Sequence, residues 1–409
     1  MTPNDKVAEA MVKRRAGQFA FLKDLVRTRT APSPDGSVKA SEKIAQMLER
    51  LGFEVERHAP TADHLDASGH PPLQNLVVRS RFGDGPTLAF ASHLDTLTPS
   101  DDWSVDPFQG HIKDGTMIGS GAISGKGHLA AQAFAILALA DIGARPKGTI
   151  ELHISFDGDS GGGHGAKWLL NEEIVQPDMV IAGGAARAVA TQSTGTLVLD
   201  VDVRGATAPA YALDGGHDAM EAANQALTRL YQFRSTLKSK MSDVPGLGAP
   251  SLIVEHVSAG RAGGGVPDHA ALRIDRRILP DEDATQVEKQ LTKLIGSTIA
   301  KMAGTRCRIR RTVLIPAMAG GETSNFLCDA IVDQLQQRLG EDVLVGGIAY
   351  DHEGRHYAAH GIPTIMYGAG PMDPVMAGMH GKNESLKLDD LRLATEVLAC
   401  ATLSLLDGK

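Results

Sequence analysis

Short apolar runs alternate with helical segments through the first half of this 409-residue chain. This alternation is a strong constraint, because strands separated by helices pair in parallel and need helices on both faces of their sheet. The predicted strands are residues 53–58, 75–80, 87–92, 149–156 and 179–184, and the predicted helices are residues 5–30, 37–51 and 128–143. The sequence therefore predicts an α/β fold with a mostly parallel central sheet.

A change of pattern near residue 192 marks a second domain. The predicted strands beyond it alternate polar and apolar residues, which is typical of antiparallel strands with one exposed face. These strands are residues 194–205, 251–260, 268–279 and 306–315, with helices at 219–233 and 283–302. The α/β pattern resumes after residue 324. We therefore expect a discontinuous α/β domain of residues 1–192 and 312–409, with an inserted α+β lid or dimerisation domain of residues 193–311.

The composition argues against several classes of protein. The net charge is −8 and basic runs are missing, which argues against partners such as nucleic acid or anionic membranes. The N-terminal stretch is polar, and no apolar run approaches the roughly 20 residues of a membrane helix. The three cysteines are scattered, which suits a reducing compartment. We therefore expect a cytoplasmic protein whose partner is a small molecule.

Several sequence blocks occur in a specific order. Residues 92–127 read SHLDTLTPSDDWSVDPFQGHIKDGTMIGSGAISGKG, and later blocks read GVPDHAALRIDRRILPDED, GIPTIMYGAG and MHGKNESLKLDDL. Together they resemble the dizinc exopeptidase family that contains acetylornithine deacetylase, succinyl-diaminopimelate desuccinylase and aminoacylase. The resemblance covers essentially the whole chain. It implies a two-domain fold, a homodimer and hydrolysis of an amide-like C–N bond in a small molecule.

The resemblance assigns metal-site roles to four residues of this chain, of which Asp159 stands where the family has a glutamate. It implies that His93 binds one zinc ion and that Asp95 orients the His93 imidazole. It also implies that Asp159 and His380 bind a second ion. Arginines at two further positions, Arg277 and Arg355, match places where the family favours anion binding. A carboxylate or similar anion on the substrate would suit them.

Three other positions depart from the family pattern. The aspartate that should bridge both ions reads Ser124, the glutamate that should act as general base reads Gly158, and a further acidic ligand reads Gly184. Serine has no negative charge at neutral pH, and two neighbouring dications need a bridging carboxylate. A two-metal site is therefore not expected. His93, Asp159 and His380 leave enough donors for one weak mononuclear site.

A serine nucleophile is one alternative. Removing the metal would leave the Ser124 hydroxyl facing the His93 imidazole, with Asp95 behind it. These are the roles of nucleophile, base and orienting carboxylate in a catalytic triad.

A relocated metal is another alternative. The stretch AYDHEGRHY brings Asp351, His352, Glu353 and His356 to a loop that lines the family's substrate pocket. With His380 and Asp159 these residues would form a single zinc or manganese site. Glu353 or His352 would then replace the missing base.

A third alternative is a catalytically silent pseudoenzyme that keeps the fold as a binding or partner subunit. Loss of the base without an assured replacement favours it. In that case a separate partner chain would perform the catalysis.

Overall fold

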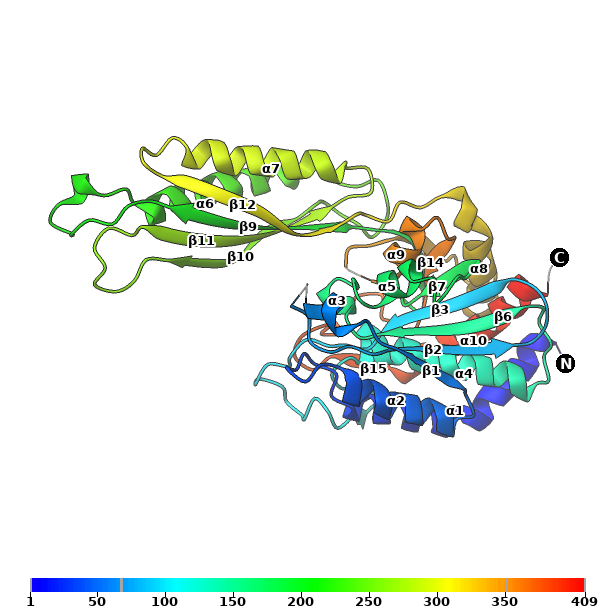
Figure 1. Ribbon diagram of the computed structural model, residues 1–409. Coiled ribbons are helices and arrows are strands. Elements are labelled where there is room, and N and C mark those ends of the chain that lie inside the picture. The colour runs from blue at the N-terminus through cyan, green and yellow to red at the C-terminus, as the bar shows by residue number, and fades with distance from the viewer. Residues whose placement is uncertain (1, 67–68, 351, 408–409) are drawn as a thin grey trace. The chain divides into compact units, whose positions relative to one another are not determined.

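Two compact units make up the structure, a computed structural model that describes residues 2–66, 69–350 and 352–407 (Figure 1). The larger unit comprises the chain up to Thr191, residues 320–346 and the chain from His352 onward. The smaller unit comprises residues 192–319 and 347–351. The chain returns to the larger unit at residue 320 instead of the expected 312, because the last strand of the smaller unit continues to Ile315.

An eight-stranded mixed sheet forms the centre of the larger unit. In spatial order its strands are β1 (Val55–His58), β2 (Asn75–Arg81), β6 (Thr149–Ser155), β3 (Thr87–His93), β7 (Met179–Ala182), β14 (Thr364–Met366), β8 (Ala188–Ser193) and β13 (Leu344–Ile348). The four strands β6, β3, β7 and β14 run parallel, whereas β1, β2 and β8 pair antiparallel. The predicted α/β fold with a parallel sheet centre is confirmed.

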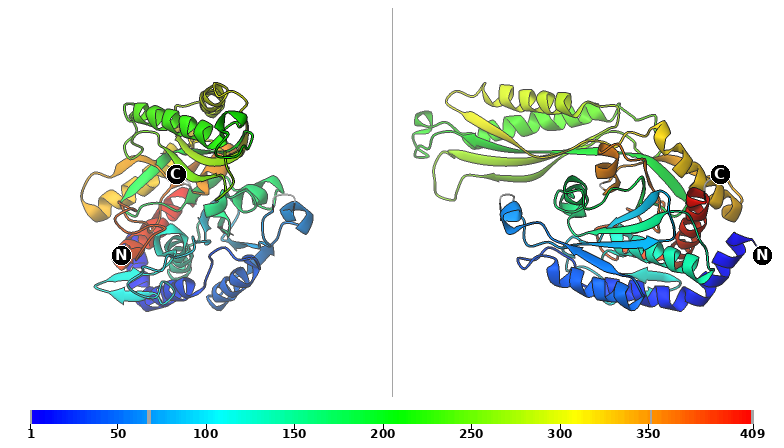
Figure 2. Two further views of the ribbon diagram at one scale, coloured as in Figure 1. Left: turned by 90° about the vertical axis from the view of Figure 1, so that its left-hand side faces the viewer. Right: turned by 45° about the vertical axis from the view of Figure 1, so that its right-hand side comes forward.

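Helices flank this sheet. They are α1 (Pro3–Arg27), α2 (Val38–Arg50), α3 (Ala62–Asp66), α4 (Gly127–Asp141), α5 (Ala166–Asn171), α8 (Asn325–Leu339), α9 (Gly354–Ala359) and α10 (Leu388–Leu406). The N-terminal helix α1 and the C-terminal helix α10 pack against each other and against α4 (Figure 2). A separate three-stranded sheet has the order β15 (Ser385–Lys387), β5 (Thr116–Ile118) and β4 (His111–Lys113).

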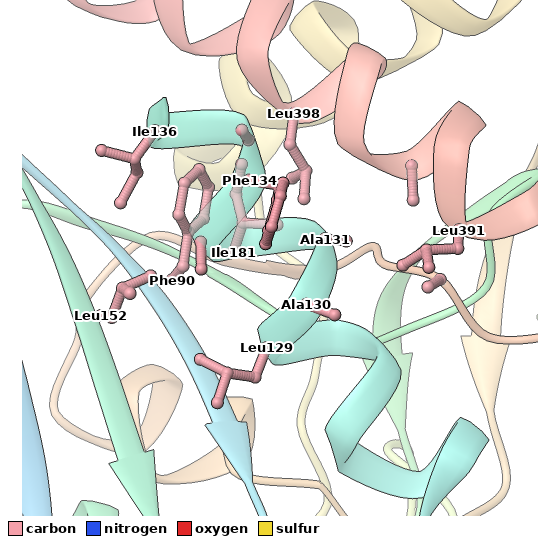
Figure 3. Packing of buried hydrophobic residues seen from close by; sticks show 14 of the residues in the cluster. Phe90, Leu129, Ala130, Ala131, Phe134, Ile136, Leu152, Ile181, Leu391 and Leu398 are labelled. Atoms are coloured by element: carbon pink, nitrogen blue, oxygen red, sulfur yellow. The ribbon is translucent and has the colours of Figure 1, made fainter. Parts of the chain in front are cut away.

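Helix α4 is the centre of the main core. Its sequence is apolar on every face, and such a helix is stable only when it is buried on all sides. Phe134 packs at the middle of the cluster that includes Phe90, Ile181 and Leu398 (Figure 3). The stretch Ala122–Asp141 is long and apolar enough to cross a membrane by length and composition, but its most apolar window of 18 residues is entirely buried inside the protein. It is therefore accounted for as a core helix.

The smaller unit has its own sheet and core. Its antiparallel strands have the order β10 (Leu252–Ala259), β11 (His269–Ile278), β9 (Gly195–Arg204) and β12 (Arg306–Ile315). Helices α6 (Ala219–Leu237) and α7 (Ala284–Ile299) pack together on this sheet (Figure 1). Asp218 and Asp283 begin the two helices, since each side chain accepts two backbone N–H groups of the first turn.

Replacing Phe134 by alanine tests the role of α4. The side chain is 1% exposed, so the F134A variant should lose about 3–5 kcal/mol of unfolding free energy through lost burial and a residual cavity. Chemical denaturation of the purified variant measures this loss. Val12→Ala is the control, because Val12 is 68% exposed on α1 and its truncation should change stability by less than about 0.5 kcal/mol. Equal effects of both changes would contradict the central role of α4.

Candidate functional site

The candidate site lies where the four parallel strands end. Strand β3 ends at His93, and β6 is followed directly by the loop that contains Asp157 and Asp159. Strands β7 and β14 end beside it, at Ala182 and Met366. Because neighbouring parallel strands end at the same edge of a sheet, this edge is where an α/β fold usually binds its ligand.

His93 is held by a buried carboxylate. Its Nδ1 lies 2.7 Å from Glu353 Oε1, and its Nε2 lies 3.5 Å from Asp159 Oδ1. Burial lowers the pKa of His93, but the charges of Glu353 and Asp159 raise it well above the usual value. Burial raises the pKa of Glu353, but the charge and hydrogen bond of His93 bring it down to about 2. The two side chains therefore form a buried ion pair.

Asp95 does not take the orienting role expected of it. Its two carboxylate oxygens accept the backbone N–H groups of Gly158 and Asp159, each at 2.9 Å. Glu353 occupies the position behind the imidazole instead. The pKa of Asp95 is raised to about 7, mainly by burial; the charge of His93 opposes this rise, and the charges of Asp159 and Asp157 add to it. Asp95 therefore fixes the loop that carries Asp159, and Glu353 fixes His93.

Ser124 lies in a single π-helical turn, Ala122–Lys126, that precedes α4. The carboxylate of Glu384 holds this turn, because it accepts the backbone N–H groups of Gly121, Ile123 and Ser124 at 2.8–3.1 Å. Ser124 Oγ is buried and hydrogen-bonds to no residue in the part of the chain that the structure describes. The predicted contact between this hydroxyl and His93 is therefore not formed.

Gly158 is in close contact with the His93 ring. A Cβ atom built on Gly158 would lie 2.3 Å from His93 Cγ, far inside the contact distance of two carbons. Any side chain at this position would have to displace the imidazole. The place where the family has its general base is therefore closed to a side chain while His93 pairs with Glu353.

The predicted metal ligands come together only in pairs. Asp159 lies 3.5 Å from His93 Nε2 through one oxygen and 3.8 Å from His380 Nδ1 through the other. These separations approach the ~3.3 Å between two ligands of one tetrahedral zinc ion. However, no group of three or more His, Cys, Asp or Glu side chains among residues 2–66, 69–350 and 352–407 is arranged to hold a metal ion. His352 is buried beside Glu353, and Asp351 lies outside the described residues.

The donor set does not fit a two-cation centre. The bridging position is the neutral Ser124, and Gly184 provides no side-chain donor. His93 Nε2 and Asp159 Oδ2 are both buried without a hydrogen-bond partner in the described chain, so a single cation between them and His380 is the most that these residues fit.

The sequence analysis missed His128. Its ring packs against Gly183 and Gly368, where an added Cβ would lie 2.4–2.5 Å from ring atoms. Its Nδ1 accepts the backbone N–H of Ala369 at 3.1 Å, which leaves the proton of the neutral ring on Nε2. Burial lowers the pKa of His128 to about 4. A signal was present in the sequence, since His128 directly follows the Ser-Gly-Lys-Gly motif.

A buried polar chain supports the helix that follows Glu353. His153 Nδ1 lies 2.9 Å from the Tyr357 hydroxyl on α9, and His153 Nε2 lies 2.7 Å from Glu151. Arg79 in turn donates to Glu151 at 2.8 Å. This chain of contacts joins α9 to strands β2 and β6, so it contributes to the position of Glu353.

The two predicted anion-binding arginines belong to different units. Arg355 is buried on α9, in the larger unit. Arg277 lies on β11 in the smaller unit, where its guanidinium donates to both oxygens of Asp275 at 3.1 and 3.2 Å and to Thr196 Oγ1. Their role in substrate binding stays a prediction.

Comparisons with known proteins agree on one family and one fold. Residues 89–404 match the family model described as peptidase family M20/M25/M40. Succinyl-diaminopimelate desuccinylase from Acidiphilium cryptum (strain JF-5) is 28% identical over 404 residues, 93% of this chain and 96% of that protein. The di-peptidase Dug1p from Saccharomyces cerevisiae matches over 99% of both chains, with 15% identity and a TM-score of 0.79. Human carnosine dipeptidase 1 matches over 100% of both chains, with 17% identity and a TM-score of 0.75.

Replacing Glu353 by glutamine tests the ion pair. At pH 7 the E353Q variant should lose about 3 kcal/mol of unfolding free energy, because His93 remains buried without its charged partner. The folded-state pKa of Glu353 is depressed, so its contribution exists above the unfolded value near 4.5 and is lost as the pH falls through about 2. Denaturation at pH 7 and at pH 3 should therefore show a smaller difference at pH 3. An equal difference at both values would contradict the ion pair.

Lys126 provides a second test, in a higher pH range. Its ammonium donates to two backbone carbonyls, those of Thr28 and Ser120, and burial lowers its pKa to about 7. The unfolded chain holds the Lys126 proton up to about pH 10.5, so stability due to this residue should rise between pH 7 and pH 9. The slope is at most about 1.4 kcal/mol per pH unit. Lys126→Met should remove that slope in parallel denaturation curves, and an unchanged slope would contradict the lowered pKa.

Proposed function

We propose that this chain, which belongs to the peptidase family M20/M25/M40, hydrolyses an amide-type C–N bond in a small anionic molecule. Members of the family are hydrolases that usually bind zinc or other divalent metals. The full-length relative is by name a desuccinylase, and the two similar structures are dipeptidases. An N-acyl amino acid or a dipeptide-like amide is therefore the substrate class that these relatives support.

One observation carries the proposal: at the end of the parallel strands, two buried polar atoms of the described chain make no hydrogen bond, although Asp159 lies 3.5 Å from His93 and 3.8 Å from His380. His93 Nε2 and Asp159 Oδ2 are both fully buried and lack hydrogen bonds within the described chain. Leaving such an atom unpaired costs about 1–3 kcal/mol. These atoms lie at the edge of the sheet where α/β folds bind their ligands. A polar ligand bound there would give them the hydrogen bonds that they lack.

The chain's own residues give this site a fixed geometry. Glu353 accepts from His93 Nδ1 and thereby directs Nε2 toward Asp159. Asp95 holds the backbone of the loop that carries Asp159, and Glu384 holds the turn that carries Ser124. When bound between His93, Asp159 and His380, a divalent cation would supply Lewis-acid polarisation of the scissile carbonyl. The Ser124 hydroxyl remains the candidate nucleophile of a route that needs no cation.

A specific observation favours a second candidate, a binding subunit without catalysis. The His93 ring fills the space in which a side chain at position 158 would begin. The carboxylate of Glu353, which would have to replace that base, is paired with His93. A chain of this kind would bind a small amide and leave it intact. The homodimer, a partner chain and the cytoplasmic location remain expectations.

Hydrolysis assays separate the two candidates. The purified protein, stripped with chelator and then supplied with zinc or manganese, is incubated with N-succinyl and N-acetyl amino acids and with dipeptides. Release of the free amine is expected, and His93→Gln and Asp159→Asn should each lower kcat/KM by about 100-fold or more, because both side chains face the reacting group. Asp342→Asn, an exposed change in the same unit, should have no effect.

The metal and serine routes give different results in the same assay. Metal content measured by mass spectrometry should be at most one ion per chain and should fall in Asp159→Asn. Turnover that persists undiminished in Ser124→Ala rules out the serine route. The protein could instead bind these amides without releasing amine, whether zinc, manganese or no metal is added. That result would overturn the proposed hydrolase activity and support the binding subunit.

A further inference from the structure

The loop that carries His380 is compact and closed at its base. We call residues 377–385 the His380 loop. Ser385 donates its backbone N–H to the carbonyl of Ala377 at 3.0 Å. A Cβ atom added to Gly378 would lie 2.7 Å from a backbone oxygen on the opposite side of the loop, so the two sides are in contact. A shift of one side of the loop therefore moves the other.

Two residues of the His380 loop have an unusual backbone conformation. His380 and Asn383 are non-glycine residues with φ angles of +59° and +57°, in the left-handed region. This conformation costs energy for a residue with a Cβ atom, and it persists only where the surroundings impose it. The contacts that impose it come from two segments outside the loop.

The contact between Asn383 and Ser104 is the first of these. Asn383 Oδ1 accepts the backbone N–H of Ser104 at 3.0 Å and its hydroxyl at 3.1 Å, although the two residues are 279 positions apart in sequence. Trp103, the residue before Ser104, borders the same small cavity as His380. The segment that contains Trp103 and Ser104 therefore lies alongside the His380 loop.

The next residue, Glu384, makes the second contact. Its carboxylate accepts three backbone N–H groups of the turn that carries Ser124, and its carbonyl accepts the N–H of Gly119 at 2.8 Å. A substitution of Glu384 would therefore disturb this turn as well as the His380 loop. Removal of the Asn383 side chain acts on the loop without touching the turn of Ser124.

The imidazole of His380 is not enclosed by its neighbours. The side chain is 32% exposed, and its Nδ1 lies 3.8 Å from Asp159 Oδ2, which is beyond hydrogen-bond distance. The direction of the ring therefore depends on the backbone that carries it. Contacts that fix this backbone also fix where the ring points.

We propose that Asn383 and Ser104 are positioning residues of the candidate site, because their contact holds the His380 imidazole beside Asp159. This inference rests on the proposed function and extends its site to the segment after β3. A cation bound between His93, Asp159 and His380 would bind more tightly as a result, since a ligand that is already in place loses less freedom on binding.

NMR of the imidazole groups in the metal-free protein tests the position of His380 directly. His380→Gln assigns the signal by its loss, and carbon-13 relaxation of the ring then reports its mobility. Asn383→Gly suits the left-handed backbone but removes the acceptor, so the His380 ring should become more mobile. Asn383→Asp keeps an acceptor oxygen and should leave the ring as it is in the parent protein. Ser104→Ala removes one of the two hydrogen bonds and should have an intermediate effect.

Asp114→Gly is the control for added backbone freedom. Asp114 has a φ angle of +49° in the turn between β4 and β5, and its replacement should leave the His380 signal unchanged. Thermal unfolding of each variant checks that it folds. A His380 ring that is no more mobile in Asn383→Gly than in the parent overturns the positioning role. A ring that is equally mobile in Asn383→Asp and Asn383→Gly overturns it too, because the acceptor would then have no effect.

Zinc affinity gives a second readout that needs no turnover. In a titration against a chromophoric chelator, Asn383→Gly should weaken zinc binding about tenfold and Ser104→Ala about threefold, while Asn383→Asp should bind as the parent does. A more mobile His380 ring with unchanged zinc affinity would overturn the positioning role.

The amine-release assay keeps this inference apart from the proposed function. If the parent protein releases no amine, the hydrolase is rejected and the NMR result alone decides the positioning role. If the parent binds no zinc, the cation route is rejected and the NMR result again decides. Hydrolysis by the parent, together with an unchanged ring in Asn383→Gly, rejects the positioning role alone.

Discussion

The buried ion pair between His93 and Glu353 is the contact on which the arrangement of the candidate site depends. An ionised group taken out of water is stable only with a partner of opposite charge and satisfied hydrogen bonds. The two residues are 260 positions apart in sequence, so the pair joins the end of β3 to the start of α9. The contacts of Tyr357 with His153 hold α9 against the sheet from the other side. Helix α9 is therefore held in place both by the ion pair of Glu353 and by the contact of Tyr357 with His153.

Most of the fold could be predicted from the sequence because its signals are local. Strands such as β3 and β7 are buried on both faces and read as mainly apolar runs, while β9 alternates, as a half-exposed strand does. Helix α4 is apolar on every face and is buried from Gly127 to Leu139. The limits of the inserted unit were harder to place, and the expected boundary at residue 312 falls inside β12, a strand that the sequence pattern itself predicts.

The candidate site was predicted in part. The positions of His93, Asp159 and His380 at one edge follow from the order of the parallel strands and the family blocks. The pairing of His93 with Glu353 was not predicted. The carboxylate of Asp95 accepts backbone N–H groups instead, and the directions of these groups depend on the loop conformation. His128 was missed for a related reason: its ring packs against Gly183 and Gly368, which lie far from it in sequence.

The contact between Gly158 and the His93 ring has a consequence for the history of this lineage. A substitution at codon 158 that adds any side chain is penalised until the imidazole has first moved away from Glu353. Movement of the imidazole is itself penalised while Glu353 stays buried and charged. Introduction of a glutamate at position 158 would therefore require several changes in a definite order, with less stable proteins between them. A steric contact of this kind makes a glycine easier to keep than to replace.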